Sequence, residues 1–138
     1  MIRTFVDSGV LISAATGRDA LFDKALDILD DPERVLITSD FVRLEVLPKA
    51  MYFQRQDEVE FYETFFASVE QTVHISEALI AQAHIEAQNA GLGALDALHV
   101  AAAKASAAEE LVTTERPTTA LFRVAGITVT TIRPVERV

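Results

Sequence analysis

Four acidic residues stand among hydrophobic neighbours and are the side chains with the clearest capacity for chemistry. They are Asp7, Glu45, Asp96 and Glu115. Asp7 follows the apolar residues 4–6, and Glu115 comes soon after a second apolar run at 111–113. Because ionised carboxylates are rarely buried without a partner, acids in such places predict either helix caps or a site where a cation supplies the missing charge.

Asp7 allows both interpretations. Residues 4–6 are β-branched or aromatic and predict a buried strand, so Asp7 would stand at the carboxyl end of that strand, where parallel α/β sheets bind ligands. Asp7 or Ser8 could equally cap a helix that begins near Val10. The residue alone leaves the two interpretations open, and the positions of the other acids favour the ligand site.

The other acids predict a shared metal site. If the strands before Asp7 and Glu115 are adjacent and parallel, both acids emerge at one edge, and the helix that begins near Asp96 could start there too. Two like charges about 4 Å apart cost about 4 kcal/mol at an effective dielectric constant of about 20. Mg²⁺ or Mn²⁺ would relieve this repulsion, because these ions prefer carboxylate oxygens and need no nitrogen or sulfur ligand.

The periodicity of the chain predicts an α/β fold with strands and helices in alternation. We expect strands at residues 4–6, 34–38, 72–75, 111–113 and 127–132, and helices at 18–29, 41–47, 77–87, 94–108 and 118–124. Pro48 predicts that the second of these helices stops or kinks at Leu47. This order is typical of a parallel sheet with helices on both faces, in one domain over residues 1–138.

Residues 50–69 are unusually aromatic. Four of the eight phenylalanines fall there, and Val59, Tyr62, Phe66 and Val69 make a stripe at helical spacing. One helix on a small domain cannot easily bury so many aromatic side chains against its own core. We therefore expect part of this segment to contact another subunit, which would make a homodimer, and the alternative is that it folds back as ordinary core.

The composition narrows the classes of protein. The chain has 138 residues and no cysteine, which excludes a disulfide scaffold, a thiolate zinc site and a cysteine nucleophile. Its net charge of −9 argues against nucleic-acid binding through a broad basic surface, although not against a nuclease that meets phosphate through a metal ion. No apolar run reaches the roughly 18 residues of a membrane span, and Asp7 interrupts the apolar N-terminus, so we expect a cytoplasmic protein.

Four short motifs in register resemble those of the PIN domain family, and most closely its VapC-like toxins. They are Phe5-Val-Asp7-Ser8, Arg43-Leu-Glu45-Val, Leu95-Asp96-Ala-Leu-His99-Val-Ala and Leu111-Val-Thr113-Thr-Glu115. The resemblance implies a five-stranded parallel sheet with an acidic pocket at its carboxyl edge. It assigns metal binding to Asp7, Glu45 and Asp96. Glu115 stands where the family usually has aspartate, with Thr113 and Ser8 at hydroxyl positions beside the pocket.

The resemblance also implies an activity and a partner: hydrolysis of RNA by a Mg²⁺- or Mn²⁺-dependent ribonuclease, and inhibition by a small antitoxin. The alternatives are a PIN-like interaction protein without turnover, and a nuclease that cuts single-stranded DNA, because nothing in the sequence distinguishes the two nucleic acids. His99, one turn after Asp96, could act as a general base, but we expect it to pack against the sheet or to form a local hydrogen bond. A haloacid-dehalogenase phosphatase would need an aspartate where Gly9 stands.

Overall fold

The fold is known from a computed structural model that describes residues 1–18 and 20–134. Its elements are β1 (Ile2–Val6), α1 (Ser8–Thr16), α2 (Phe22–Leu29), β2 (Arg34–Ser39), α3 (Asp40–Tyr52), α4 (Gln56–Ser68), β3 (Gln71–Val73), α5 (Glu77–Ala90), α6 (Ala94–Ala105), β4 (Glu110–Thr113), a 3₁₀ turn η1 (Ala120–Arg123) and β5 (Thr128–Thr131). The helix predicted at 18–29 begins at Phe22, and residue 19 and the last four residues of the predicted domain lie outside the described residues.

The strands form one parallel sheet in the order β3-β2-β1-β4-β5. β1 lies at its centre, where Phe5 is in register with Ile37 of β2 and Leu111 of β4. These three side chains have no exposed surface, as expected for strands covered on both faces. The predicted α/β class with a five-stranded parallel sheet is therefore confirmed.

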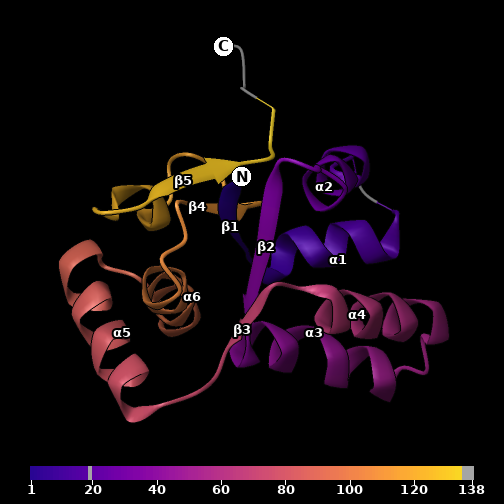
Figure 1. The fold of residues 1–138 in the computed structure, drawn as a ribbon, viewed down its shortest axis with the longest axis horizontal. Coiled ribbons are helices and arrows are strands. Elements are labelled where there is room, and N and C mark those ends of the chain that lie inside the picture. Colours follow the sequence, from indigo (N-terminus) through magenta and orange to yellow (C-terminus); the bar gives the residue numbers. More distant parts are fainter. Residues whose placement is uncertain (19, 135–138) are drawn as a thin grey trace.

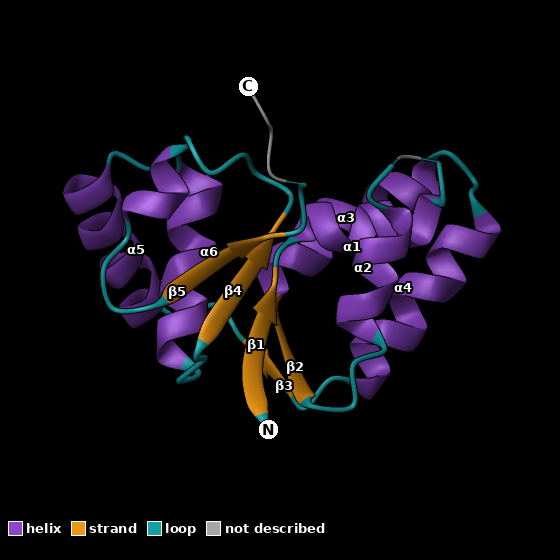
Figure 2. Ribbon diagram, turned by 90° about the horizontal axis from the view of Figure 1, so that it is seen from above, coloured by secondary structure: helices purple, strands orange, loops and turns teal. Residues whose placement is uncertain are grey.

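Helices cover both faces of the sheet in unequal numbers. Helices α1 to α4 lie on one side, and α5 and α6 lie together on the other (Figures 1 and 2). This arrangement follows from right-handed crossovers, since the chain adds β2 and β3 on one side of β1 and then returns to add β4 on the other. Figure 2 also shows the arrowheads of β1 and β4 at the same edge of the sheet, which is where the chain order reverses.

Helix α3 is longer than the sequence predicted. Ser39 caps it by accepting a hydrogen bond from the Val42 amide (3.3 Å), and the helix continues through Pro48 to Tyr52. The prediction that it stops at Leu47 is wrong, and the alternative of a kink there stays a prediction. A proline inside a helix costs about 3 kcal/mol, but Leu47 and Ala50 on either side of it are buried in the core, and this packing outweighs the lost backbone hydrogen bond.

Most of the aromatic segment folds back onto its own domain. Tyr62 and Phe65 of α4 are buried, and Phe61 and Phe66 pack against the core. The exposed rings are Tyr52 and Phe53, which follow one another at the end of α3 and meet edge to face with centroids 4.9 Å apart. The alternative of ordinary core thus holds for α4, and a homodimer stays a prediction.

Among the described residues, no helix combines the length and hydropathy needed to cross a bilayer.

Candidate active site

The acids gather where the chain order of the sheet reverses. β1 and β4 are neighbours, and the connections that leave their carboxyl ends run to different sides of the sheet. Ligands in open α/β sheets bind in the crevice outside such a point. Asp7 directly follows β1, and Thr113 is the last residue of β4.

Asp7 is held by two hydrogen bonds. Its Oδ1 accepts from the backbone amide of Val10 (3.3 Å), so it caps α1, and its Oδ2 accepts from the Thr113 hydroxyl (2.6 Å). The side of the residue that remains open faces a cavity. Asp7 therefore caps α1, as one interpretation of the sequence predicted, and it also lines a pocket. Ligand binding there, the other interpretation, stays a prediction.

Burial raises the pKa of Asp7 from 3.8 to about 6. Only 6% of the residue is exposed, so its ionised form has lost most of its hydration. The hydrogen bond from Thr113 and the nearby His99 lower the pKa but do not offset the burial, and the charge of Asp96 raises it further. Asp7 is thus a buried carboxylate whose negative charge the protein compensates incompletely.

Glu45 reaches the same cavity from α3. Its Oε1 lies 2.6 Å from His99 Nε2, and its Oε2 accepts a hydrogen bond from the Ser8 hydroxyl (3.0 Å). Burial alone would raise the pKa of Glu45, but the bond and charge of His99, together with the Ser8 bond, bring the pKa below its ordinary value. These contacts therefore favour the ionised form of Glu45.

Asp96 lies in the first turn of α6, as the sequence predicted. Burial raises its pKa, repulsion from Glu45 adds to the effect, and His99 opposes it. Since the N-terminus of α6 points its free amide groups toward the same region, the helix favours negative charge there. The three acids thus influence one another's ionisation.

Glu115 lies on a loop that is fixed from two sides. Its backbone amide donates to Thr113 Oγ1 (3.1 Å), the hydroxyl that also holds Asp7, and its carbonyl accepts from Thr131 Oγ1 (2.6 Å). Thr114 sits close to Gly9: a Cβ added to Gly9 would stand 2.2 Å from Thr114 Oγ1. The absence of a side chain at Gly9 is what lets this loop approach α1.

A single cavity of about 510 Å³ joins these residues. It is lined by Asp7, Ser8, Gly9, Glu45, Gly93, Ala94, Leu95, Asp96, His99, Thr114 and Glu115. All four predicted acids and Ser8 thus face one space, while Thr113 lies behind Asp7 and bonds to it. Within the described parts of the chain, however, no three acidic or histidine side chains converge closely enough to form a ready-made metal cage.

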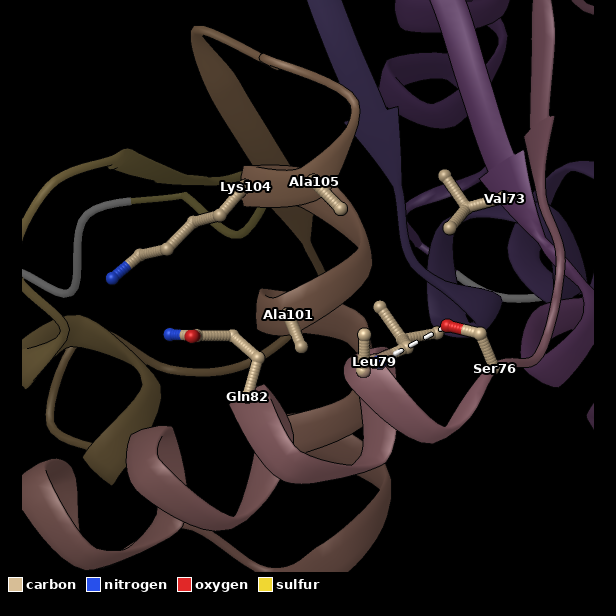
Figure 3. A pocket seen from close by; sticks show the side chains of 8 residues that line it. Val73, Ser76, Leu79, Gln82, Ala101, Lys104 and Ala105 are labelled. Atoms are coloured by element: carbon tan, nitrogen blue, oxygen red, sulfur yellow. Dashed lines mark hydrogen bonds between the residues drawn. The ribbon is translucent and has the colours of Figure 1, made fainter.

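A second cavity, of about 490 Å³, has a different character. Figure 3 shows it between α5 and α6, where the side chains of Gln82 and Lys104 extend in the same direction. Its remaining lining is largely apolar, and its Ser76 hydroxyl is engaged by the Leu79 amide at the start of α5. Lys104 itself is paired with Glu86 (2.6 Å). This cavity contains no cluster of uncompensated charge.

Sequence reasoning found the acids but missed the contacts that arrange them. His99 does pack against the sheet, with its ring centroid 6.0 Å from that of Phe5, but its hydrogen bond goes to Glu45 on another helix. Gly9 and Thr114 were not singled out for this contact. The sequence offers one indication of the Gly9–Thr114 contact, which is that each residue lies close to a predicted acid. The partners in both contacts, His99 with Glu45 and Gly9 with Thr114, are far apart in the sequence.

Comparison with known proteins supports the same fold. In solved structures, the chain is similar to VapBC2 from Rickettsia felis bound to a promoter DNA fragment (15% identity, 94% of this chain and 98% of that one covered, TM-score 0.70). It is also similar to a toxin–antitoxin complex from Klebsiella pneumoniae (20% identity, 96% and 99% covered, TM-score 0.67) and to Mycobacterium tuberculosis VapC20, a sarcin–ricin loop cleaving toxin (18% identity, 78% and 86% covered, TM-score 0.63).

No relative is found among curated protein sequences. A match to the PIN domain family, in contrast, extends over residues 4–117, from the centre of β1 past Glu115, and so includes every acid of the cavity. With the parallel sheet and the acidic edge already described, this match establishes that the chain belongs to the PIN domain family.

Proposed function

We propose that the protein is a divalent-metal-dependent ribonuclease that hydrolyses RNA phosphodiester bonds, and that it is the toxin of a toxin–antitoxin pair. The observation that carries the proposal is the cavity shared by Asp7, Glu45, Asp96 and Glu115, in which the buried Asp7 has no ion-pair partner among the described residues. Membership of the PIN family supports a nuclease, and the similarity to VapC20, a toxin that cleaves the sarcin–ricin loop, supports RNA as substrate.

The donor set of the cavity fits Mg²⁺ or Mn²⁺. All four acids offer hard oxygen ligands, and the raised pKa of Asp7 reflects negative charge that burial leaves poorly stabilised. We assign metal binding to Asp7, Glu45 and Asp96, with Glu115 as an outer ligand. A bound ion would supply a Lewis acid and lower the pKa of a coordinated water.

The chain's own groups orient this site. The Thr113 hydroxyl fixes one oxygen of Asp7 while the Val10 amide fixes the other, so the carboxylate cannot turn out of the cavity. Ser8 and His99 do the same for Glu45. The N-termini of α1 and α6 both lie at the cavity, and the positive ends of their helix dipoles favour an anionic group such as a phosphate.

The acidic composition is consistent with this chemistry. With a net charge of −9, the chain gains little affinity from a general attraction to phosphate. Recognition would then depend on the cavity and its ion, and on a few local basic side chains. We expect binding to depend strongly on divalent cation and less on monovalent salt than in proteins that bind through a basic surface.

We further infer a small antitoxin partner. Several of the similar structures are toxin–antitoxin complexes, including the one from Klebsiella pneumoniae and VapBC from Salmonella typhimurium. An acidic chain with exposed Tyr52 and Phe53 suits a partner with basic and apolar groups. The same exposed rings support the proposed homodimer, which light scattering of the purified chain would test by giving twice the monomer mass.

The decisive assay incubates the purified chain with single-stranded RNA and with single-stranded DNA of the same sequence, with Mg²⁺, with Mn²⁺ and with EDTA. We expect cleavage of RNA only with a divalent ion. Asp96→Asn should abolish it, because the variant loses a charged ligand while keeping the shape of the side chain. Asp23→Asn, which changes an exposed aspartate in the first turn of α2, is the matched control and should cut normally.

Other results would identify the alternatives. Cutting of DNA in preference to RNA would favour a DNA nuclease. Absence of cleavage of either strand, together with absence of Mn²⁺ binding, would favour an interaction protein without turnover. Full activity of Asp96→Asn would refute the proposed site.

A further inference from the structure

The bond between His99 and Glu45 joins the two helical layers at the cavity. It runs from α6 to α3, between residues 54 positions apart, and its length of 2.6 Å makes it one of the shortest side-chain contacts at the site. Because an ionised carboxylate only accepts, the hydrogen must be on His99 Nε2. His99 is 3% exposed, so this is a bond made largely away from water.

The other ring nitrogen has no comparable role. His99 Nδ1 is buried and has no hydrogen-bond partner among the described residues. Its neighbourhood includes the Phe5 ring, which lies at a tilt of 40° to the imidazole. A buried polar atom without a partner is unfavourable, and an apolar side chain would avoid that cost at this position. The polarity of His99 is therefore justified by the single bond that it donates to Glu45.

We propose that His99 is a positioning residue that holds Glu45 in the cavity for a divalent cation. Glutamate has three rotatable side-chain bonds, and a partly exposed one samples many rotamers unless both oxygens are engaged. His99 takes Oε1 and Ser8 takes Oε2, which leaves one orientation. This inference rests on the proposed function, because it assigns His99 a role in preparing that same site.

The geometry argues against His99 as the general base. A base that activates water must accept a proton, and the Nε2 that faces the cavity side is occupied in donating to Glu45. Nδ1 is buried and has no hydrogen-bond partner among the described residues, so it is not placed to take a proton from a water in the cavity either. His99 acts on the reaction through Glu45 and not on the water itself.

Two amide substitutions separate this role from simple packing. In His99→Gln the amide nitrogen stands as many bonds from the backbone as Nε2 does, so it can still donate to Glu45. In His99→Asn the amide is one carbon shorter and cannot. We measure Mn²⁺ binding to the full-length chain by the electron paramagnetic resonance signal of free Mn²⁺, and RNA cleavage in parallel.

We expect His99→Asn to weaken Mn²⁺ binding about 10- to 100-fold, as is common when the hydrogen-bond partner of a metal ligand is lost, and His99→Gln to restore most of it. The matched control is His74→Asn, the same substitution at a histidine whose carboxylate contact lies outside the cavity, from His74 Nδ1 to Asp40 (3.1 Å). That variant should bind Mn²⁺ as the unmodified chain does. Equal Mn²⁺ affinity in folded His99→Asn and unmodified protein would overturn the proposal.

A measurement without any substitution protects against misfolding of the variants. In ¹⁵N-histidine-labelled protein, Mg²⁺ should shift the Nε2 resonance of His99 and leave that of His74 in place. An unshifted His99 resonance in protein that binds Mg²⁺ would refute the positioning role alone. If the unmodified chain binds neither ion, the metal site of the proposed function fails together with this inference.

Discussion

Two buried carboxylates in this molecule differ in whether a basic side chain neutralises them. Glu86 of α5 is 5% exposed and both its oxygens contact the Lys104 ammonium of α6, at 2.6 and 3.0 Å. Asp7 is equally buried at 6% exposed, yet its direct partners are a hydroxyl and an amide. The first acid is neutralised within the protein, and the second is only oriented.

The comparison distinguishes a charge that the protein neutralises itself from one that it leaves for the proposed site. Both acids lie close to cavities of nearly the same volume, about 490 Å³ beside Lys104 and about 510 Å³ beside Asp7. Burial or cavity size would rank the two alike. What differs is whether the protein supplies the counter-ion. At Asp7 burial raises the pKa to about 6, and no ion pair among the described residues offsets it. A buried acid that is held in place but left without a cation is the better indicator of a site.

The largest expected effect comes from Asp7→Asn, which should abolish RNA cleavage and stabilise the fold. The raised pKa of Asp7 means that the folded state holds this proton more tightly than the unfolded chain, so the contribution of Asp7 to stability is greatest below about pH 4 and is lost as pH rises through about 6. This penalty amounts to about 3 kcal/mol at neutral pH. Asparagine removes it and can still cap α1. Urea denaturation at pH 7.5 and pH 4 should show a gain only at the higher pH.

Glu86→Gln should have the opposite effect on stability in the same urea denaturation. It leaves Lys104 with a neutral partner in a partly buried place, so we expect a loss of about 2 kcal/mol and unchanged cleavage per folded molecule. If Asp7→Asn destabilises the protein at pH 7.5 as much as Glu86→Gln does, the two acids are alike and the comparison fails.

An added cation should remove the difference between the two acids. With Mn²⁺ at about one hundred times its dissociation constant, binding should stabilise the folded chain by about 2.7 kcal/mol and raise the midpoint of thermal unfolding by roughly 10 °C. Binding should weaken as pH falls below about 6, because protonated Asp7 ligates poorly. Differential scanning calorimetry with Mn²⁺ and then EDTA checks this, and the shift should be absent in Asp7→Asn. An equal shift in that variant would locate the ion elsewhere.

The smallest expected effect comes from Gly9→Ala, which tests how closely the Thr114 loop packs against α1. Gly9→Ala would bring a Cβ to 2.2 Å from Thr114 Oγ1, so the Thr114 side chain must move. We expect a net loss of about 1 kcal/mol, since overpacking is partly offset by the better helix propensity of alanine, and a modest fall in cleavage. Combining it with Thr114→Ala should restore the stability measured by urea denaturation. Additive losses in the double variant would contradict a direct clash.

The sequence predicts the strands and their acids well because both depend on local pattern. Residues 4–6 and 111–113 have the β-branched and apolar character of buried strands, and acids that follow parallel strands must emerge at one edge. That β1 and β4 are neighbours, and so bring Asp7 beside Thr113, does not follow from local pattern. It depends on the order in which the chain adds strands, and from the sequence that adjacency could be stated only as a condition.

Features that depend on tertiary contacts could not be predicted from the sequence pattern. Pro48 predicts a helix end from local sterics, but core packing on both sides carries α3 past it. The aromatic rings of residues 50–69 could have been core or interface, and only the docking of α4 shows that most are core. The His99–Glu45 bond crosses between helices on opposite faces, and no spacing rule relates such residues.

The meeting of α3 and α6 beyond the end of the sheet has a consequence during synthesis. Glu45 belongs to one helical layer and Asp96 to the other, and the hydroxyl that fixes Asp7 arrives only with β4. A growing chain therefore lacks a complete acidic cavity until β4 and the loop that follows it have left the ribosome. Folding intermediates and truncated products that stop before β4 should be inert, and the proposed nuclease activity would be a property of the finished domain alone.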